Sequence, residues 1–230
     1  DYFKIDSMFG DDQDFLELCN EAHKRKMKIV LDLVFNHSSN ENKMFLDVVK
    51  NGKKSKYHDF YKIDGDKPIE NPINYETFGN VKNMPKLNSN NYDEMDYFVE
   101  VGKYFIEKFG VDGYRLDVAN EVSHVFWEHF KFELRKIKPD IILIGECWNN
   151  ASSYLKSNEF ESVMNYPFFF TCKDIFVTKY IDAKVFSERL SGLLMRYPEG
   201  NDRLMLNLLD SHDIERFYNL CKPNKDLYRL

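Results

Sequence analysis

Short, almost continuously apolar runs alternate along this chain with segments whose apolar residues recur at helical spacing. The apolar runs are MKIVLDLVF (27–35), VDGYRLDVA (111–119), DIILIGECW (140–148), ESVMNYPFF (161–169) and RLMLNLLD (203–210). The helical spacing occurs at 11–26, 95–109, 122–137 and 171–195. Strands this apolar are covered on both faces, as in a parallel sheet. The pattern predicts an α/β fold, either a doubly wound sheet or a (β/α)₈ barrel, with five strands in this sequence.

One long segment interrupts the alternation. Residues 38–92 are polar, rich in Asn, Lys, Gly and Pro, and show no sustained period. The segment is too long for an ordinary loop. We therefore expect a small inserted domain at 38–92, between a barrel segment at 1–37 and a second barrel segment at 93–230.

Composition excludes several classes of protein. The 230 residues carry a net charge of −6 with scattered basic residues, unlike the basic stripe of a nucleic-acid-binding protein. No apolar run approaches the roughly 18 residues of a membrane span, and the first residues show no signal-peptide pattern. Four widely spaced cysteines form no CxxC pair, which favours a reducing compartment over a zinc site. We expect a cytoplasmic protein with no nucleic-acid or membrane partner.

Nucleotide-binding motifs are also missing. No GxGxxG or GxxxxGK[ST] follows any of the predicted strands, which removes the main support for a dinucleotide or P-loop protein. The chain also has no HxH or HExxH, so a metal-dependent barrel hydrolase is a weak alternative.

Polar residues gather at the carboxyl ends of the predicted strands. Arg115 and Asp117 are two apart within one strand, so their side chains point to the same face. The other strands contribute Asp32, Asn36 and His37; Glu146; and Ser211, His212 and Asp213. In α/β barrels this rim carries the chemistry, because its loops converge on one cavity. Because an unpaired buried charge costs several kcal/mol, chance does not gather structural acids in this way.

The spacing of three of these acids fits one rim. Asp117 and Glu146 are 29 residues apart, about one βα unit, and Glu146 and Asp213 are 67 apart, about two units. Three carboxylates around one cavity stabilise developing positive charge. Cleavage of a glycosidic bond requires this, since its transition state resembles an oxocarbenium ion.

The set of motifs resembles the α-amylase family, glycoside hydrolase family 13. The stretches that carry the resemblance are DLVFNH (32–37), GYRLDVANE (113–121), GECW (145–148) and LLDSHD (208–213). MPKLN (84–88) together with VANE is similar to the neopullulanase, cyclomaltodextrinase and maltogenic amylase branch. The resemblance implies a partial (β/α)₈ barrel, about strands 3 to 7, with domain B inserted after strand 3.

The resemblance also implies catalytic roles. Asp117 would be the nucleophile that forms a covalent glycosyl intermediate, and Glu146 would be the general acid and then the base. Asp213 would bind sugar hydroxyls and stabilise the distorted ring. Arg115 would keep Asp117 ionised and oriented, because a neighbouring cation lowers the pKa of a carboxylate.

Further residues would bind or support the substrate. The implied substrate-binding residues, besides Arg115, are His37, His212, Glu121, Trp148 and Asn88, with Glu121 on the leaving-group side and Trp148 as a sugar platform. Asp32 and Asn36 would support the loop after their strand. A structural calcium ion with Asn36 as a ligand is allowed by the resemblance, although the acids Asp59, Asp64 and Asp66 form no EF-hand-type loop. The chemistry requires no cofactor.

The expected function is hydrolysis of α-1,4 glucosidic bonds, with α-1,6 bonds as an additional candidate, in maltodextrins, cyclodextrins or pullulan. The anomeric configuration is retained through double displacement. A transglycosylase or α-1,6-glucosidase of the same family, and a catalytically silent carbohydrate-binding homologue, are the alternatives. Since the family's first, second and eighth strands have no counterpart in the sequence, we expect a piece of a longer enzyme. The piece alone would be inactive or nearly so, and the parent enzyme is a candidate homodimer.

Overall fold

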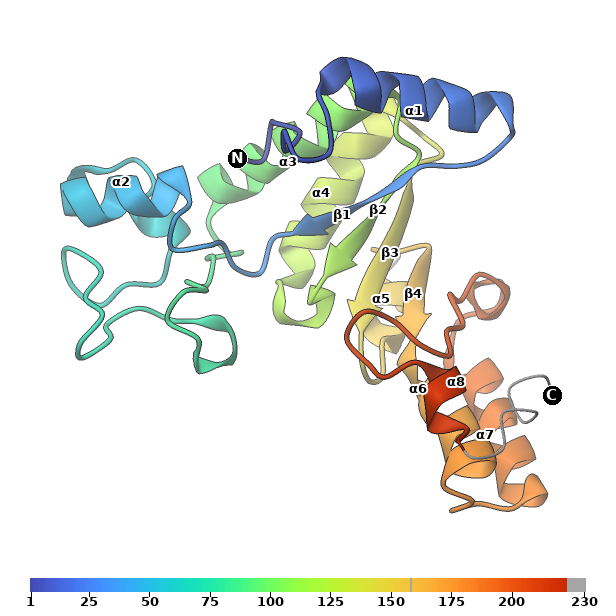
Figure 1. Ribbon diagram of the computed structural model, residues 1–230. Helices are drawn as coiled ribbons and strands as arrows, with labels where there is room; N and C mark the ends of the chain where they lie inside the picture. Colours follow the sequence, from blue (N-terminus) through green and yellow to red (C-terminus); the bar gives the residue numbers. More distant parts are fainter. Residues whose placement is uncertain (158, 223–230) are drawn as a thin grey trace. The chain divides into compact units, whose positions relative to one another are not determined.

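The computed structural model describes residues 1–157 and 159–222 (Figure 1). Two compact units make up the chain, Asp1–Leu143 and Ile144–Leu230. The helices and strands of each unit follow the alternation expected from the sequence. Within the described ranges, no helix has the length and apolar character needed to cross a membrane.

The first unit is built on two parallel strands, β1 (Val30–Val34) and β2 (Gly113–Asp117). Its helices are α1 (Asp12–Lys24), α2 (Lys43–Asn51), α3 (Tyr92–Phe109) and α4 (His124–Ile137). Short 3₁₀ turns lie at Gly52–Lys54, His58–Phe60, Phe78–Asn80 and Ala119–Glu121. The predictions for 11–26, 95–109 and 122–137 as helices are confirmed to within a few residues.

Side chains and glycines at the helix ends explain these boundaries. The Asp11 side chain accepts hydrogen bonds from backbone N–H groups in the first turn of α1. The Asp14 carboxylate in turn accepts one from the Asp11 N–H, which completes a capping box. Asn91 caps α3, and Gly110 ends it at φ +70°, a left-handed conformation that glycine adopts without strain. The structure also contains α2, which begins at the N-cap Asn42 inside the segment expected to be irregular.

An aromatic core lies between the helices and strands of the first unit. Phe35, at the end of β1, is fully buried against Phe98 of α3 and Phe130 of α4. Gly102 lets α3 and α4 approach closely, since a Cβ there would meet Phe130 at 3.0 Å. The hydroxyl of buried Tyr114 donates to the Gly102 carbonyl at 2.6 Å. This packing fixes β2, which carries Arg115 and Asp117, against α3.

The second unit contains most of β3 (Ile142–Cys147) and all of β4 (Ser162–Asn165), which pair in parallel from Ile144↔Ser162 to Cys147↔Asn165. Its helical segments are α5 (Ser152–Lys156), α6 (Tyr166–Cys172), a π turn (Lys173–Val177), α7 (Ala183–Arg196), a 3₁₀ turn (Asn201–Arg203) and α8 (Phe217–Leu220). Phe169 and Cys172 of α6 pack on Phe217 and Cys221 to form a local core.

Two sequence predictions in the second unit are wrong in extent. The strand expected over 161–169 ends at Asn165, because Pro167 lies in the first turn of α6, where proline favours a helix start. The single helix expected over 171–195 is interrupted between the π turn and α7. Lys179 has φ +55° in this interruption, and the Asp182 side chain caps α7.

The strand predicted over 203–210 is also wrong. Only Leu206 pairs with β4: its N–H donates to the Val163 carbonyl, and its carbonyl accepts from the Asn165 N–H. The Asn207 N–H then turns back to the Met205 carbonyl, which stops the ladder after one bridge. Leu206 itself is 44% exposed, so the apolar run lacks the two-sided cover that its composition suggested.

Candidate active site

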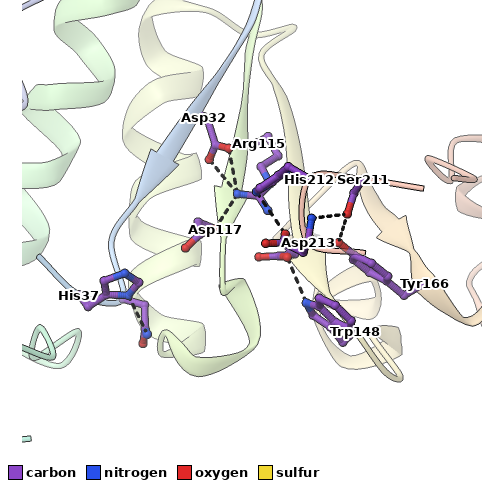
Figure 2. Close-up of polar contacts among 11 residues, drawn as sticks. Asp32, His37, Arg115, Asp117, Trp148, Tyr166, Ser211, His212 and Asp213 are labelled. Atoms are coloured by element: carbon purple, nitrogen blue, oxygen red, sulfur yellow. Dashed lines mark hydrogen bonds and ion pairs between the residues drawn. The ribbon is translucent and has the colours of Figure 1, made fainter. Parts of the chain in front are cut away.

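Arg115 links two carboxylates in the first unit (Figure 2). Its Nη1 lies 2.6 Å from Asp117 Oδ1 and 2.9 Å from each oxygen of Asp32. The Arg115 side chain is 12% exposed and that of Asp117 19%, whereas Asp32 is half exposed. The ion pair therefore holds Asp117 at a fixed place while leaving its carboxylate accessible.

The strand register explains this arrangement. Asp32 of β1 lies directly opposite Arg115 of β2, and residues opposite each other share a face of the sheet. Asp117 follows two residues after Arg115 and returns to that face. The side-by-side placement of Arg115 and Asp117 expected from the sequence is confirmed, and the structure adds Asp32 as the second carboxylate bound by this arginine.

The backbone turns sharply immediately after Asp117. Val118 has φ +45° and ψ +41°, a left-handed conformation that a β-branched residue rarely adopts. Buried Ala119 follows, and its carbonyl accepts a hydrogen bond from the indole of Trp127 at 2.9 Å. Such strain persists only where the surroundings fix it, and it is often found beside functional groups.

His37 follows β1 and lies against the segment 38–92. Its ring stacks on Phe78 with a centroid separation of 4.8 Å and parallel planes. Burial lowers the pKa of His37, whereas the charges of Asp117 and Glu121 oppose that change. The Asn36 amide lies 3.4 Å from His37 Nδ1, at the outer limit of a hydrogen bond. A neutral imidazole at this strand end can exchange hydrogen bonds with hydroxyl groups.

In the second unit, Glu146 is 3% exposed at the end of β3. The indole N–H of Trp148 donates to its Oε1 at 3.0 Å (Figure 2). Trp148 in turn stacks face to face on the fully buried ring of Tyr166, with centroids 4.1 Å apart. The stack orients the indole, and the indole fixes one oxygen of Glu146.

The same stack leads to the segment that carries Asp213. The Tyr166 hydroxyl lies 3.2 Å from the Ser211 hydroxyl, which accepts the Asp213 N–H at 3.2 Å. The imidazole of His212 lies 3.2 Å from Asp213 Oδ2, and both side chains are solvent-accessible. Glu146 and Asp213, both predicted to be catalytic, are therefore connected through Trp148, Tyr166 and Ser211 within one unit.

The remaining predicted residues, Glu121, Asn88 and Asn36, lie in the first unit. Glu121 pairs with Lys86 at 2.7 Å. The Asn88 side-chain amide donates to the Asp59 backbone carbonyl at 3.1 Å, so it links two parts of the segment 38–92. Asn36 is 1% exposed, and its Oδ1 has no hydrogen-bond partner among the described residues.

These residues do not fit a calcium site. Calcium takes six to eight oxygen ligands, yet across residues 1–157 and 159–222 no three His, Cys, Asp or Glu side chains gather as ligands. Asp59 is paired with His58, and the Asp66 carboxylate accepts the Lys53 N–H.

Some residues that contact the predicted site residues could not be identified from the sequence. Tyr166 and Phe78 lie in segments assigned to other roles, and their stacking on Trp148 and His37 depends on tertiary contacts. Pro167, one residue after Tyr166, was the available signal for a helix start at that point. Cys147, the last residue of β3, is buried, and this burial raises the pKa of its thiol to about 12.

Comparison with known proteins agrees with this geometry. The family model described as "Alpha amylase, catalytic domain" matches residues 1–230. Neopullulanase 2 of Thermoactinomyces vulgaris is 42% identical over the whole chain, and an intracellular maltogenic amylase of Bacillus subtilis is 40% identical over 98% of it. A cyclomaltodextrinase structure superposes with a TM-score of 0.93 at 40% identity over 99% of the chain.

The chain spans about two fifths of these relatives, namely 40% of the neopullulanase, 38% of the maltogenic amylase and 39% of the cyclomaltodextrinase structure. Parallel strands alternating with helices fit the predicted partial barrel, which these neighbours share. The chain belongs to the α-amylase family of glycoside hydrolases.

Proposed function

We propose that residues 1–230 supply the catalytic carboxylates of a retaining α-glucan hydrolase. Asp117 acts as the nucleophile, Glu146 as the general acid and base, and Asp213 as the residue that stabilises the distorted sugar. The observation that carries the proposal is the 2.6 Å pair between Arg115 and Asp117 at the end of β2, in a chain of this family. A nucleophile needs such a fixed, accessible carboxylate.

The reaction takes two displacements. In the first, a carboxylate oxygen of Asp117 bonds to the anomeric carbon while the glycosidic bond breaks, and Glu146 gives its proton to the departing oxygen. In the second, water attacks the anomeric carbon, Glu146 takes a proton from that water, and the bond to Asp117 breaks. Each step inverts the anomeric centre, so the product keeps the configuration of the substrate.

The surroundings of each acid support its role. The Arg115 guanidinium lies 2.6 Å from Asp117 and fixes the orientation of the attacking carboxylate. Glu146 is buried at a strand end, and the hydrogen bond from the Trp148 indole orients its carboxyl group. The exposed side chains of His212 and Asp213 can bind sugar hydroxyls.

The names of the relatives support a substrate class and a cellular setting for the full-length protein. Relatives named neopullulanase, cyclomaltodextrinase and maltogenic amylase point to pullulan, cyclodextrins and maltodextrins as substrates. The relative from Bacillus subtilis is named an intracellular maltogenic amylase, which supports an intracellular location. A homodimer of the full-length protein, the inactivity of residues 1–230 alone, and an insertion bounded by 38–92 stay predictions.

The proposal is tested with the full-length protein on β-cyclodextrin, pullulan and maltotriose. We expect hydrolysis of at least one of them, with the α-anomer released first in the NMR spectrum. E146Q should lower kcat by several orders of magnitude while leaving the fold unchanged by circular dichroism. Initial release of the β-anomer, or an E146Q variant with normal activity, would contradict the assignment.

A transglycosylase is the second candidate. Trp148 is only partly buried and lies beside Glu146 with its ring backed by Tyr166, and aromatic faces also bind acceptor sugars. Products longer than the substrate, formed from maltotriose at high concentration, would identify this activity. A silent binding homologue would bind cyclodextrin without any turnover.

A further inference from the structure

Lys86 of the inserted segment lies beside the strand ends that carry the first unit's site residues. The main chain at 85–87 runs antiparallel to 36–38: the Ser38 N–H donates to the Pro85 carbonyl, and the Leu87 N–H donates to the Asn36 carbonyl. His37 and Lys86 are directly opposite in this pairing, so their side chains lie on one face.

The backbone of Lys86 is firmly held. Its own N–H donates to the Glu76 carbonyl at 2.9 Å, and the next residue, Leu87, is 2% exposed. Since neighbours along an extended segment point to opposite sides, burial of Leu87 directs Lys86 away from the core. The Cα position of Lys86 and the direction of its side chain are therefore fixed by the backbone.

Glu121 approaches the same place from the end of β2. Its N–H donates to the Val118 carbonyl at 3.0 Å, and buried Ala119 and Val122 anchor the turn on both sides. The carboxylate itself reaches toward solvent and is 38% exposed. The ammonium of Lys86 donates to this carboxylate, with Nζ 2.7 Å from Oε2.

An ion pair this exposed adds little to stability. Its effect is on orientation, because both backbones are already held and the pair restricts only the two side-chain ends. The pair therefore selects one position for a carboxylate that lies four residues after Asp117. Lys86 reaches this carboxylate from a segment far away in the sequence.

We propose that Lys86 is a positioning residue that fixes the Glu121 carboxylate so that it binds the sugar on the leaving-group side of the scissile bond. This inference rests on the proposed function. It predicts that the inserted segment controls selectivity for that sugar through one ammonium group and does not take part in bond cleavage.

The experiment compares two substrates in the full-length protein. Maltotetraose has sugars on both sides of a scissile bond, whereas α-maltosyl fluoride has only fluoride as its leaving group. For K86M we expect kcat/KM on maltotetraose to fall roughly fivefold, mainly through KM, while kcat/KM on α-maltosyl fluoride stays within about twofold. K86R keeps the cation and should recover most of the loss.

Two further variants separate positioning from a general effect. E121Q should reproduce the K86M defect, and K86M should add nothing in the E121Q background, because both changes remove the same contact. K82M alters an exposed lysine of the same segment and should leave both substrates unaffected. Thermal unfolding of each variant checks the fold, and K86R with E121Q decides the matter if K86M fails to fold.

The outcomes are distinct. Equal losses on the two substrates, or additive losses in the double variant, overturn the inference while the proposed function stands. A wild-type protein that hydrolyses no α-glucan contradicts the proposed function. In that case the dissociation constant for maltotetraose, measured by calorimetry, replaces kcat/KM, and an unchanged constant in K86M, or no binding by the wild type, overturns the inference.

Discussion

Arg115 holds Asp117 by a 2.6 Å contact while also contacting both oxygens of Asp32. One guanidinium group thus fixes the predicted nucleophile and is itself fixed by a neighbouring strand. Because the three residues share one face of β1 and β2, the geometry follows from strand register alone. The register thereby prepares a charged, accessible carboxylate at a strand end.

The first prediction concerns this arginine. R115K keeps the positive charge but loses the planar group that reaches two carboxylates, so we expect kcat to fall by about 10²-fold in the full-length protein. D32N should have a smaller effect, because Arg115 keeps its contact with Asp117. Steady-state kinetics on β-cyclodextrin measures both. A fully active R115K variant would show that the planar guanidinium group is not needed for activity.

The second prediction concerns stability at low pH. Asp112 is 3% exposed; burial alone would raise its pKa, but hydrogen bonds from the Ile29 N–H, Lys28 and His23 lower the pKa to about 2. A carboxyl whose pKa is lower in the folded state stabilises the fold above its unfolded pKa and loses that effect as the pH falls toward 2. The contribution at pH 7 is on the order of 2 kcal/mol.

D112N should therefore unfold at lower urea concentration than the wild type at pH 7. The difference in unfolding free energy should shrink as the pH is lowered from about 4 toward 2. D140N changes an exposed carboxylate just before β3; it is the control and should change stability by less than about 0.5 kcal/mol. A difference that does not vary with pH would refute the role assigned to Asp112.

The third prediction concerns a buried acid in the first turn of α3. Glu94 is fully buried, neither of its oxygens has a hydrogen-bond partner among the described residues, and burial raises its pKa well above the ordinary value. The folded state then binds the proton more tightly than the unfolded state. Stability is therefore lost as the pH rises above the unfolded pKa.

E94Q should stabilise the protein at pH 7, by about 1–3 kcal/mol, and have little effect near pH 4. E107Q changes an exposed glutamate of the same helix and should have no comparable effect. Urea unfolding at the two pH values measures both variants. If E94Q is destabilising at pH 7, the carboxylate has a favourable partner in solution.

Parts of the fold and site could be predicted from the sequence because they depend on local periodicity. The helices α1, α3 and α4 and the pairing of Arg115 with Asp117 follow from spacings of 3.6 and 2 residues. The partner Asp32 required the register of β1 on β2. Tyr166 and Phe78 required contacts between distant segments, which no local pattern encodes.

The apolar run at 203–210 is a case in which the sequence pattern predicts the wrong structure. Composition indicated a strand, but a ladder also needs consecutive residues facing a partner, and the turn at Met205–Asn207 leaves only Leu206 in place. Four residues after this turn, the Ser211 hydroxyl contacts the Tyr166 hydroxyl and accepts the Asp213 N–H. Here the backbone geometry decides the structure, although the residue types favour a strand.

The most direct test of the double-displacement account is to identify the residue that becomes glycosylated. E146Q in the full-length protein is treated with α-maltosyl fluoride, whose leaving group needs no acid, so the intermediate forms and its hydrolysis is slow without the base. Peptide mass spectrometry then locates the added sugar. We predict a maltosyl group on Asp117. A label on another residue, or none while fluoride is still released, would contradict the account.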